Sequence, residues 1–303
     1  MDLTNDTVAV VTGGGHGIGL ALADRFARAG CRIVLADVQD DNLAVAGDQI
    51  AAHGVEVLTV HTDVSKIEEV AALAAATMER FGAVNVVCNN AGVAGGGDPW
   101  VGPIEGWEWT VGVNLWGVVY GVRAFLPHIV ASGGGHIVNT ASIAGLFPGF
   151  SPAYDATKHA VVALTEGLYL NLKAAELPVG VSCLCPGWVK TGISDSTRNW
   201  PTEFGPVPER DPATEIARGH FERAIAEGMP PAAVADLVAE AIIDNRFWVF
   251  PHADFLDIAI ERFHRIAEGI DPQQVEQLPG MPPRSQIMAE TMAAMLATET
   301  DTA

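Results

Sequence analysis

The segment Val8-Ala9-Val10-Val11-Thr12-Gly13-Gly14-Gly15-His16-Gly17-Ile18-Gly19 decides the fold of this chain. Its first residues are apolar and β-branched, which predicts a buried strand, and an amphipathic helix is expected to begin at Ile18. The glycines between them let the backbone approach a phosphate group closely, and the helix N-terminus favours negative charge. The spacing Gly-x-x-x-Gly-x-Gly departs from the commoner Gly-x-Gly-x-x-Gly, and a plain tight turn is the alternative. We interpret the segment as a dinucleotide-binding loop with these contact residues: Gly13, Gly15, His16, Gly17, Ile18 and Gly19.

An acidic side chain follows the second apolar run. Asp37 comes directly after Arg32–Ala36, where a carboxylate can accept hydrogen bonds from ribose hydroxyls and repel a 2′-phosphate. We therefore expect NAD as the cofactor, and NADP less. The neighbouring Val38 is apolar and His16 carries no permanent charge, which agrees with this expectation. Capping of the following helix is the alternative role for Asp37.

Short β-branched runs alternate with amphipathic stretches as far as about residue 185, which predicts an α/β fold. We expect a Rossmann-type, doubly wound parallel sheet of about seven strands with helices on both faces. The expected strands are Val8–Thr12, Arg32–Ala36, Val55–Val60, Asn85–Asn89, His136–Thr140, Val179–Cys185 and Trp248–Phe250. The expected helices are Ile18–Ala29, Asp41–Ala52, Ile67–Phe81, Asn114–Ala131, Ala153–Ala175 and Pro231–Asp244. Ser65, with Glu68 three positions later, is expected to cap the third helix.

Residues 1–250 are predicted to form the catalytic domain, and residues 251–303 a helical extension of it. The extension holds two helix candidates, Asp254–Ala267 and Ser285–Ala297. Residues 192–231 interrupt the alternation, and their length and proline content predict a lid. An ordered surface excursion without function is the alternative. Arg198 and Arg218 in this segment have acidic neighbours, so we expect them to form surface ion pairs, and binding of a carboxylate ligand is the alternative.

The composition limits the partners of the protein. With 37 acidic and 17 basic residues in 303, the formal charge is −20, which disfavours nucleic acid and anionic membranes. The four cysteines lie in or beside apolar runs and predict buried, reduced thiols. The N-terminal segment lacks the basic start of a secretory signal, so we expect a cytoplasmic protein. The histidines and cysteines show no metal-ligand spacing, and no metal site is predicted.

Tyr154 and Lys158 are the residues that predict the chemistry. Four residues apart, they lie on one face of a helix. The ammonium and a positively charged nicotinamide both favour the phenolate, so the pKa of Tyr154 is expected to fall toward the working range. Tyr154 can then take a proton from an alcohol as hydride leaves for the nicotinamide, and Ser142 can hydrogen-bond the substrate oxygen. The alternatives are an exposed surface pair and a serine that only stabilises a loop.

The glycine loop, Asn89-Asn90-Ala91-Gly92, Asn114, Ser142, Tyr154, Lys158 and Pro186-Gly187 follow one another in an order that closely resembles the short-chain dehydrogenase/reductase family, over about residues 6–250. The resemblance implies an NAD(P)-dependent oxidoreductase with four catalytic residues: Asn114, Ser142, Tyr154 and Lys158. It also implies that Lys158 holds the nicotinamide ribose and that Asn114 orders a water beside it. The other implied cofactor contacts are Asp63, Val64, Asn90, Ala91, Gly92, Pro186, Gly187, Val189 and Thr191. From the residues alone, a helix N-cap is the alternative role for Asn114.

Aromatic residues near these motifs suggest the substrate. Phe147, Phe150 and Trp188 are close to them in sequence, and Trp200 and Phe204 belong to the predicted lid. We expect Ser142, Phe150, Tyr154 and Trp188 to contact a small-molecule secondary alcohol or ketone that is bulky and apolar or aromatic. Ordinary core packing is the alternative. The stretch after residue 247 faintly resembles longer relatives that oxidise benzylic alcohols in aryl ether compounds.

Two further features bear on assembly and activity. The expected helices Asn114–Ala131 and Ala153–Ala175 are apolar on more than one stripe, and the resemblance implies a homo-oligomer, a dimer or a homotetramer. The predicted function is therefore NAD-dependent hydride transfer. Two alternatives are an epimerase or dehydratase on the same scaffold and a dinucleotide-binding protein without turnover.

Overall fold

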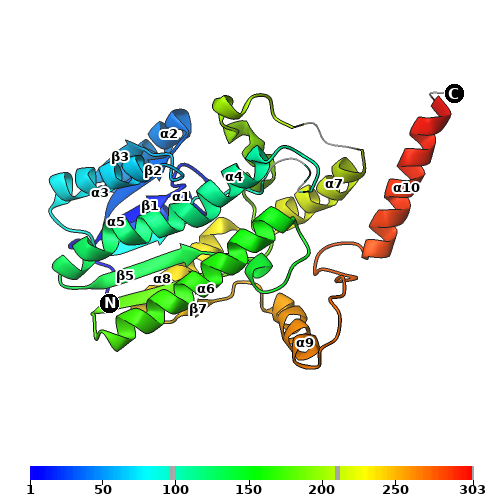
Figure 1. Cartoon of the computed structure of the whole chain (residues 1–303). Helices are drawn as coiled ribbons and strands as arrows, with labels where there is room; N and C mark the ends of the chain where they lie inside the picture. The colour runs from blue at the N-terminus through cyan, green and yellow to red at the C-terminus, as the bar shows by residue number, and fades with distance from the viewer. Residues whose placement is uncertain (96–97, 99, 209–211, 302–303) are drawn as a thin grey trace.

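The computed structural model of the chain describes residues 1–95, 98, 100–208 and 212–301. Within them, a sheet of seven parallel strands has the order β3-β2-β1-β4-β5-β6-β7 (Figure 1). Its strands are β1 (Val8–Thr12), β2 (Arg32–Asp37), β3 (Val57–His61), β4 (Val86–Asn89), β5 (Gly135–Thr140), β6 (Val179–Leu184) and β7 (Trp248–Val249). The predicted doubly wound Rossmann-type sheet is confirmed. Its order reverses between β1 and β4, and a crevice opens at the carboxyl ends of strands at such a reversal.

Helices cover both faces of the sheet because its inner strands are apolar on both sides. Along β1, Val8 and Val10 enter one core and Ala9 and Val11 the other. The first core contains residues of α3 (Ile67–Phe81), α5 (Gly117–Ala131) and α6 (Pro152–Ala174). The second contains residues of α1 (Gly17–Arg28), α2 (Asp40–Ala51) and α8 (Pro231–Asp244). All four cysteines are buried and free, as predicted.

The fourth predicted helix is longer than expected. It begins as α4 (Glu105–Val111), passes through a π-helical turn η1 (Gly112–Trp116) and continues as α5. The sequence analysis missed α4 and placed the helix start at Asn114. Glycines at 112 and 117 interrupt the apolar spacing there, although the backbone stays helical.

Other boundaries moved by a few residues. The third strand was expected at Val55–Val60, whereas β3 begins two residues later, at Val57. The last strand was expected at Trp248–Phe250, whereas β7 ends at Val249. The predicted cap of α3 was wrong: the residue before the helix is Lys66, and the Ser65 hydroxyl donates to Asp63 Oδ1 at 2.7 Å. That nearby carboxylate draws the hydroxyl away from the helix N-terminus.

The predicted lid contains regular structure. It comprises the 3-10 segments η3 (Ile193–Asn199) and η4 (Thr202–Phe204) and the helix α7 (Pro212–Glu227), which the sequence analysis did not anticipate. The C-terminal extension holds α9 (Leu256–Ala267), which follows a 3-10 turn η5 (Ala253–Phe255), and α10 (Arg284–Asp301). Figure 1 shows α10 beside α7 and projecting from the sheet layers.

Candidate active site

A cavity of about 570 Å³ lies between the carboxyl ends of the strands and the lid. Most of the predicted site residues line it: Gly13, His16, Gly17, Ile18, Asn90, Ala91, Gly92, Ser142, Phe150, Tyr154, Lys158, Pro186, Gly187, Trp188, Val189 and Thr191. Six others do not line it: Gly15, Gly19, Asp37, Asp63, Val64 and Asn114. The fold therefore brings the glycine loop and the predicted catalytic residues Ser142, Tyr154 and Lys158, which are about 130 residues apart in sequence, to one cavity.

The glycine loop has the shape that a diphosphate requires. Gly17, the first residue of α1, has φ +60°, and a Cβ on Gly19 would overlap the carbonyl oxygen of Gly13. Only glycine fits these positions, which leave free the backbone N–H groups at the start of α1. On the lid side, Thr191 Cγ2 lies 3.1 Å from the point where a Cβ on Gly17 would stand. These residues fit a dinucleotide whose diphosphate lies between the helix N-terminus and the start of the lid.

Asp37 lies behind the loop at the tip of β2. It is 5% exposed, and its Oδ2 accepts a hydrogen bond of 2.9 Å from Gly15 N. Its Oδ1 accepts from Gln39 N at 3.0 Å. The carboxylate thus fixes the glycine loop to β2, and each oxygen retains a lone pair for a further donor.

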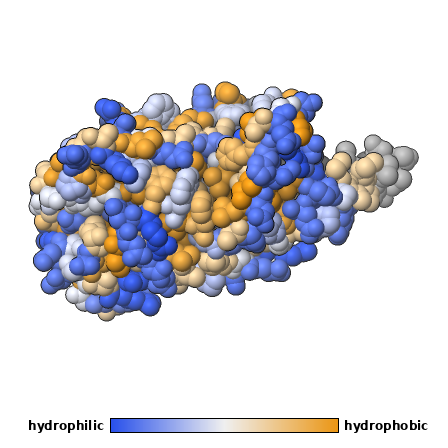
Figure 2. Space-filling view, turned by 90° about the horizontal axis from the view of Figure 1, so that it is seen from below, coloured by the Kyte–Doolittle hydropathy of each residue, from blue (hydrophilic) through white to orange (hydrophobic). Residues whose placement is uncertain are grey.

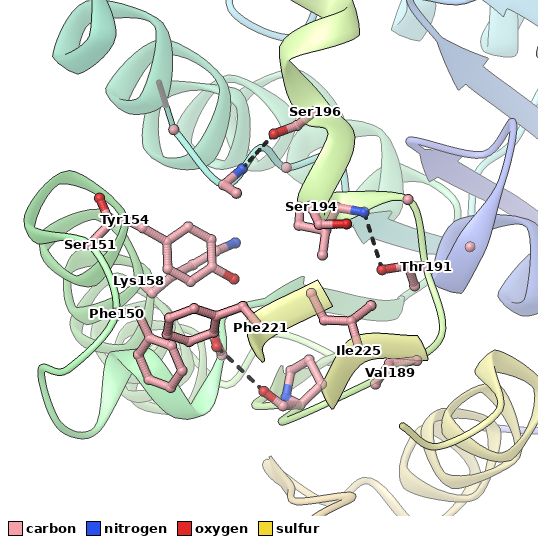
Figure 3. Close-up of a pocket in the computed structure, with 18 of the residues that line it drawn as sticks. Phe150, Ser151, Tyr154, Lys158, Val189, Thr191, Ser194, Ser196, Phe221 and Ile225 are labelled. Carbon is pink, nitrogen blue, oxygen red and sulfur yellow. Dashed lines mark hydrogen bonds between the residues drawn. The ribbon is translucent and has the colours of Figure 1, made fainter. Parts of the chain in front are cut away.

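Lys158 and Tyr154 lie on one face of α6, as predicted. Figure 3 shows both side chains pointing into the cavity. Lys158 Nζ donates to the carbonyl oxygen of Thr140 at 3.0 Å and lies 5.6 Å from the centre of the Tyr154 ring. The sequence analysis missed Thr140, because a backbone carbonyl at the end of β5 leaves no mark in the side-chain pattern.

The pKa values of Tyr154 and Lys158 differ from the expectation. Burial raises the pKa of Tyr154 to about 12, and a hydrogen bond with Ser142 opposes that rise. Burial also lowers the pKa of Lys158 to about 8. The predicted fall in the Tyr154 pKa is therefore wrong for the protein alone. Burial thus favours the neutral form of both groups: it keeps the proton on the Tyr154 phenol, and it makes the positive charge of Lys158, which was expected to favour the phenolate, less stable.

Asn114 connects the loop after β4 to α6. Its Oδ1 accepts from Val93 N at 2.8 Å, and its Nδ2 donates to Val93 O at 2.9 Å and to Thr157 Oγ1 at 3.3 Å. It lies within the π-helical turn, so the alternative of a helix N-cap is wrong. Asn114 Oδ1 and Lys158 Nζ lie 3.3 and 3.6 Å from the same point, where a Cβ on Gly92 would stand. The water role implied for Asn114 stays a prediction.

Asp63 and Val64 form the turn after β3. Asp63 Oδ1 accepts from Ser65, and the ammonium of Lys66 lies 3.5 Å from Asp63 Oδ2. Val64 is buried with Trp109 beneath the turn. Their adenine contacts stay a prediction.

Three aromatic rings form one wall of the cavity beside Tyr154. Trp188 packs edge-to-face on Phe150 and Phe221, with ring centroids 5.7 and 5.6 Å apart. Figure 3 shows Phe150 and Phe221 side by side in this wall. The sequence analysis missed Phe221 and Ile225, whose spacing of four within Pro212–Glu227 was the available signal.

Other aromatic residues proved to be structural. Phe147 is 1% exposed and does not line the cavity. Trp200 packs edge-to-face on Trp109 at 5.3 Å, and Phe204 on Trp200 at 5.8 Å. These lid aromatics anchor the lid to α4, and the alternative of ordinary packing holds for all three.

The two lid arginines behave differently. Arg218 forms the expected ion pairs, at 2.8 Å with Glu222 and 3.5 Å with Glu215. The expectation for Arg198 was wrong, because its guanidinium donates to Gly192 O, Asp195 O, Gln39 and His16. The fold places it over the glycine loop, away from the acidic residues near it in sequence. Within the described part of the chain, no group of three His, Cys, Asp or Glu side chains is placed to hold a metal ion.

Comparisons with known proteins agree with this geometry. The profile of the short chain dehydrogenase family matches residues 7–202. The chain is 38% identical, over 82% of its length and 85% of the relative's, to 1-deoxy-11-beta-hydroxypentalenate dehydrogenase of Streptomyces avermitilis.

Two solved structures are similar to it throughout the sheet. One is a short chain dehydrogenase/reductase of Burkholderia phymatum in complex with NAD, with a TM-score of 0.86, 41% identity, and coverage of 90% of this chain and 98% of that one. The other is a variant of actinorhodin polyketide ketoreductase with NADPH, with a TM-score of 0.69, 32% identity, and coverage of 83% and 97%.

Proposed function

The chain belongs to the short-chain dehydrogenase family, and we propose that it transfers hydride between NAD and a bulky, apolar or aromatic secondary alcohol or ketone. One observation carries the proposal: Ser142, Tyr154 and Lys158 line the same cavity as the glycine loop. The family relationship establishes an oxidoreductase that uses a nicotinamide dinucleotide. The choice of NAD and the class of substrate are our proposal.

The reaction needs one proton and one hydride to move together. The bound nicotinamide supplies the hydride acceptor or donor. Tyr154 takes the hydroxyl proton of the alcohol during oxidation and returns it during reduction. Ser142, whose Oγ accepts from Ala144 N at 3.1 Å and lies 3.4 Å from Pro186 O, offers its hydroxyl to the substrate oxygen, where charge develops. Lys158 holds its ammonium beside the Tyr154 ring, fixed by Thr140 O.

The structure of β2 supports NAD. The buried Asp37 carboxylate lies at the tip of the strand, next to the loop. A ribose diol can donate hydrogen bonds to its free lone pairs, whereas a 2′-phosphate in the same place would meet a negative charge. This charge is held in position by two backbone N–H groups and cannot turn away without losing them.

The cavity wall supports a bulky substrate. Phe150, Trp188 and Phe221 present rings on one side of Tyr154, and Ile225 adds an aliphatic surface. Burial of a ring or alkyl group against such a wall stabilises binding by about 25 cal/mol for each Å² of apolar surface. The named substrate of the Streptomyces avermitilis relative, a hydroxypentalenate, carries a hydroxyl group. An alcohol with an apolar body fits this wall.

The test is direct. The purified protein is mixed with NAD and a panel of bulky secondary alcohols, aromatic and alicyclic, and NADH absorbance is followed. Formation of NADH that is lost in Tyr154→Phe supports the proposal. NAD binding without NADH formation across the panel would contradict it. Isotope exchange into the substrate without net NADH would instead identify an epimerase or dehydratase.

We further propose a homo-oligomer, as the family resemblance implied. An 18-residue window of the stretch Glu105–Ala131 has a mean hydropathy of 1.2, so by length and composition the stretch could cross a membrane, a property shared with the core helices of soluble proteins. Trp116 in η1 and Leu170 in α6 remain 46% and 61% exposed. Figure 2 shows apolar side chains gathered along the middle of one face. Contact between subunits would cover such surface.

Buried free thiols agree with a cytoplasmic location.

A further inference from the structure

Arg198 lies where the lid meets the nucleotide end of the cavity. It belongs to η3, which is fastened on its other side by a hydrogen bond of 3.0 Å from Ala94 N to Ser196 Oγ, drawn in Figure 3. From η3 the Arg198 guanidinium reaches 2.7 Å from the ring Nε2 of His16, the residue immediately before α1. The lid segment therefore crosses the cavity, and its cation lies next to the N-terminus of α1.

The guanidinium is held firmly by neutral groups. Nη1 donates to Gly192 O at 2.8 Å and to Asp195 O at 2.7 Å, and Nε donates to Gln39 Oε1 at 3.3 Å. Nη2 donates to His16 Nε2. A guanidinium has five N–H donors, so these four contacts leave one N–H on Nη2, adjacent to His16.

Within the described residues, no carboxylate forms an ion pair with Arg198. Among the described residues, its hydrogen-bond partners are two backbone carbonyls, an amide and an imidazole. The nearby imidazole is neutral, because burial first and Arg198 next lower the pKa of His16. In a chain with a formal charge of −20, a preorganised cation without a carboxylate partner is an expected place for an anionic ligand.

We propose that Arg198 is a phosphate ligand of the bound dinucleotide, which donates its remaining N–H to the diphosphate. This inference rests on the proposed use of a dinucleotide. The diphosphate is favoured because Arg198 lies beside the residue that precedes α1, where helix N–H groups also bind phosphate. A 2′-phosphate is disfavoured, because Asp37 Oδ2 lies only 4.0 Å from His16 Nδ1, on the other side of that ring.

The arrangement also links the lid to the cofactor. The same guanidinium joins η3, the glycine loop and Gln39, the residue before α2. A diphosphate that accepts from Arg198 therefore stabilises the position of η3 across the cavity.

The experiment measures binding to Arg198→Gln, Arg198→Lys and the wild type by calorimetry, with NADH, NADPH, ADP, 2′,5′-ADP and adenosine as probes. Arg28→Gln, which removes an equal charge from the far end of α1, is the matched control. We expect Arg198→Gln to bind NADH and ADP about tenfold more weakly, the lower end for a charged hydrogen bond, and adenosine as tightly as the wild type. Arg198→Lys should recover part of the loss, and Arg28→Gln should bind as the wild type does.

Each other outcome decides against the inference. Unchanged NADH and ADP affinities in Arg198→Gln would overturn it, as would an equal loss for adenosine, which would show that Arg198 only supports the loop. A loss confined to NADPH and 2′,5′-ADP would assign the residue to a 2′-phosphate. If the wild type binds neither NADH nor NADPH, the proposed function fails as well, so the two failures are distinguishable.

Discussion

The indole nitrogen of Trp188 donates a hydrogen bond of 2.7 Å to the carbonyl oxygen of Pro279, 91 residues later in the chain. This bond ties the C-terminal extension to the aromatic wall of the cavity. Leu278 and Met281, on either side of it, are buried in the same cluster as Phe147 and Phe255. The extension is thus part of the substrate side of the site.

Removal of this bond is expected to weaken substrate binding alone. In Trp188→Phe the ring remains apolar but loses its donor, and Pro279 O loses its partner. We expect kcat/KM for a bulky alcohol to fall about fivefold, as for one neutral hydrogen bond, mainly through KM, with the NADH Kd unchanged. Steady-state kinetics checks this. Trp248→Phe, at the sheet edge on β7, is the control. Equal kcat/KM in Trp188→Phe and wild type would show that the bond does not position the wall.

The pH profile is expected to report the contact between Ser142 and Tyr154. The Ser142 hydrogen bond lowers the pKa of Tyr154, against the rise caused by burial. Ser142→Ala removes it, so Tyr154 should lose its proton only at higher pH. Alcohol oxidation needs the deprotonated form. We expect kcat/KM for oxidation to fall about a hundredfold near neutral pH and its rise with pH to move to higher values. If kcat/KM of Ser142→Ala falls but its pH dependence does not shift, Ser142 contacts the substrate without changing the pKa of Tyr154.

Lys158, for which we propose a catalytic role, is expected to lower the free energy of unfolding of the protein at neutral pH. Its pKa in the folded protein is about 8, below the ordinary value of 10.5, because of burial. Between these two values the unfolded chain binds more protons, so the contribution of Lys158 to the free energy of unfolding rises with pH. Lys158→Met, although inactive, should be more stable than wild type by about 1–2 kcal/mol at pH 7, after the loss of the bond to Thr140 O.

Urea unfolding at pH 7 and again near pH 10 tests this prediction. The advantage of Lys158→Met should shrink as the pH rises toward the unfolded value, because the wild type no longer has to carry a buried charge. A difference that does not change with pH would mean that Lys158 is charged throughout this range.

The charge of Asp37 is expected to decide between the two cofactors. Asp37→Asn removes the charge and keeps one oxygen that can accept from Gly15 N, although the hydrogen bond from Gln39 N to the other oxygen is lost. We expect the ratio of kcat/KM for NADP to that for NAD to rise about tenfold, equal to about 1.4 kcal/mol of repulsion removed. Asp37→Ala should show the same change of ratio together with weaker binding of both cofactors, since the loop loses its contact. An unaltered ratio in Asp37→Asn would refute the assignment.

Local patterns were sufficient for much of this molecule. Buried parallel strands are continuous apolar runs, so six of the expected strands lie within two residues of β1 to β6, and the loop between β1 and α1 shows its glycines directly. The spacing of Tyr154 and Lys158 alone places both on one face of α6. The elements and residues that the sequence did not predict have two causes. Glycines hid α4 and the π-helical turn, and the polar face of α7 concealed Phe221 and Ile225.

The sequence by itself determined the strand-loop-helix at the N-terminus and the catalytic triplet, because each depends on residues that are close along the chain. Only the tertiary structure decided what surrounds them. The raised pKa of Tyr154 comes from its burial, and the carbonyl partner of Lys158 and the contact of Arg198 with His16 join residues that are 18 and 182 positions apart. Desolvation and contacts between separate elements exist only once the sheet has brought those elements together, so no local pattern records them.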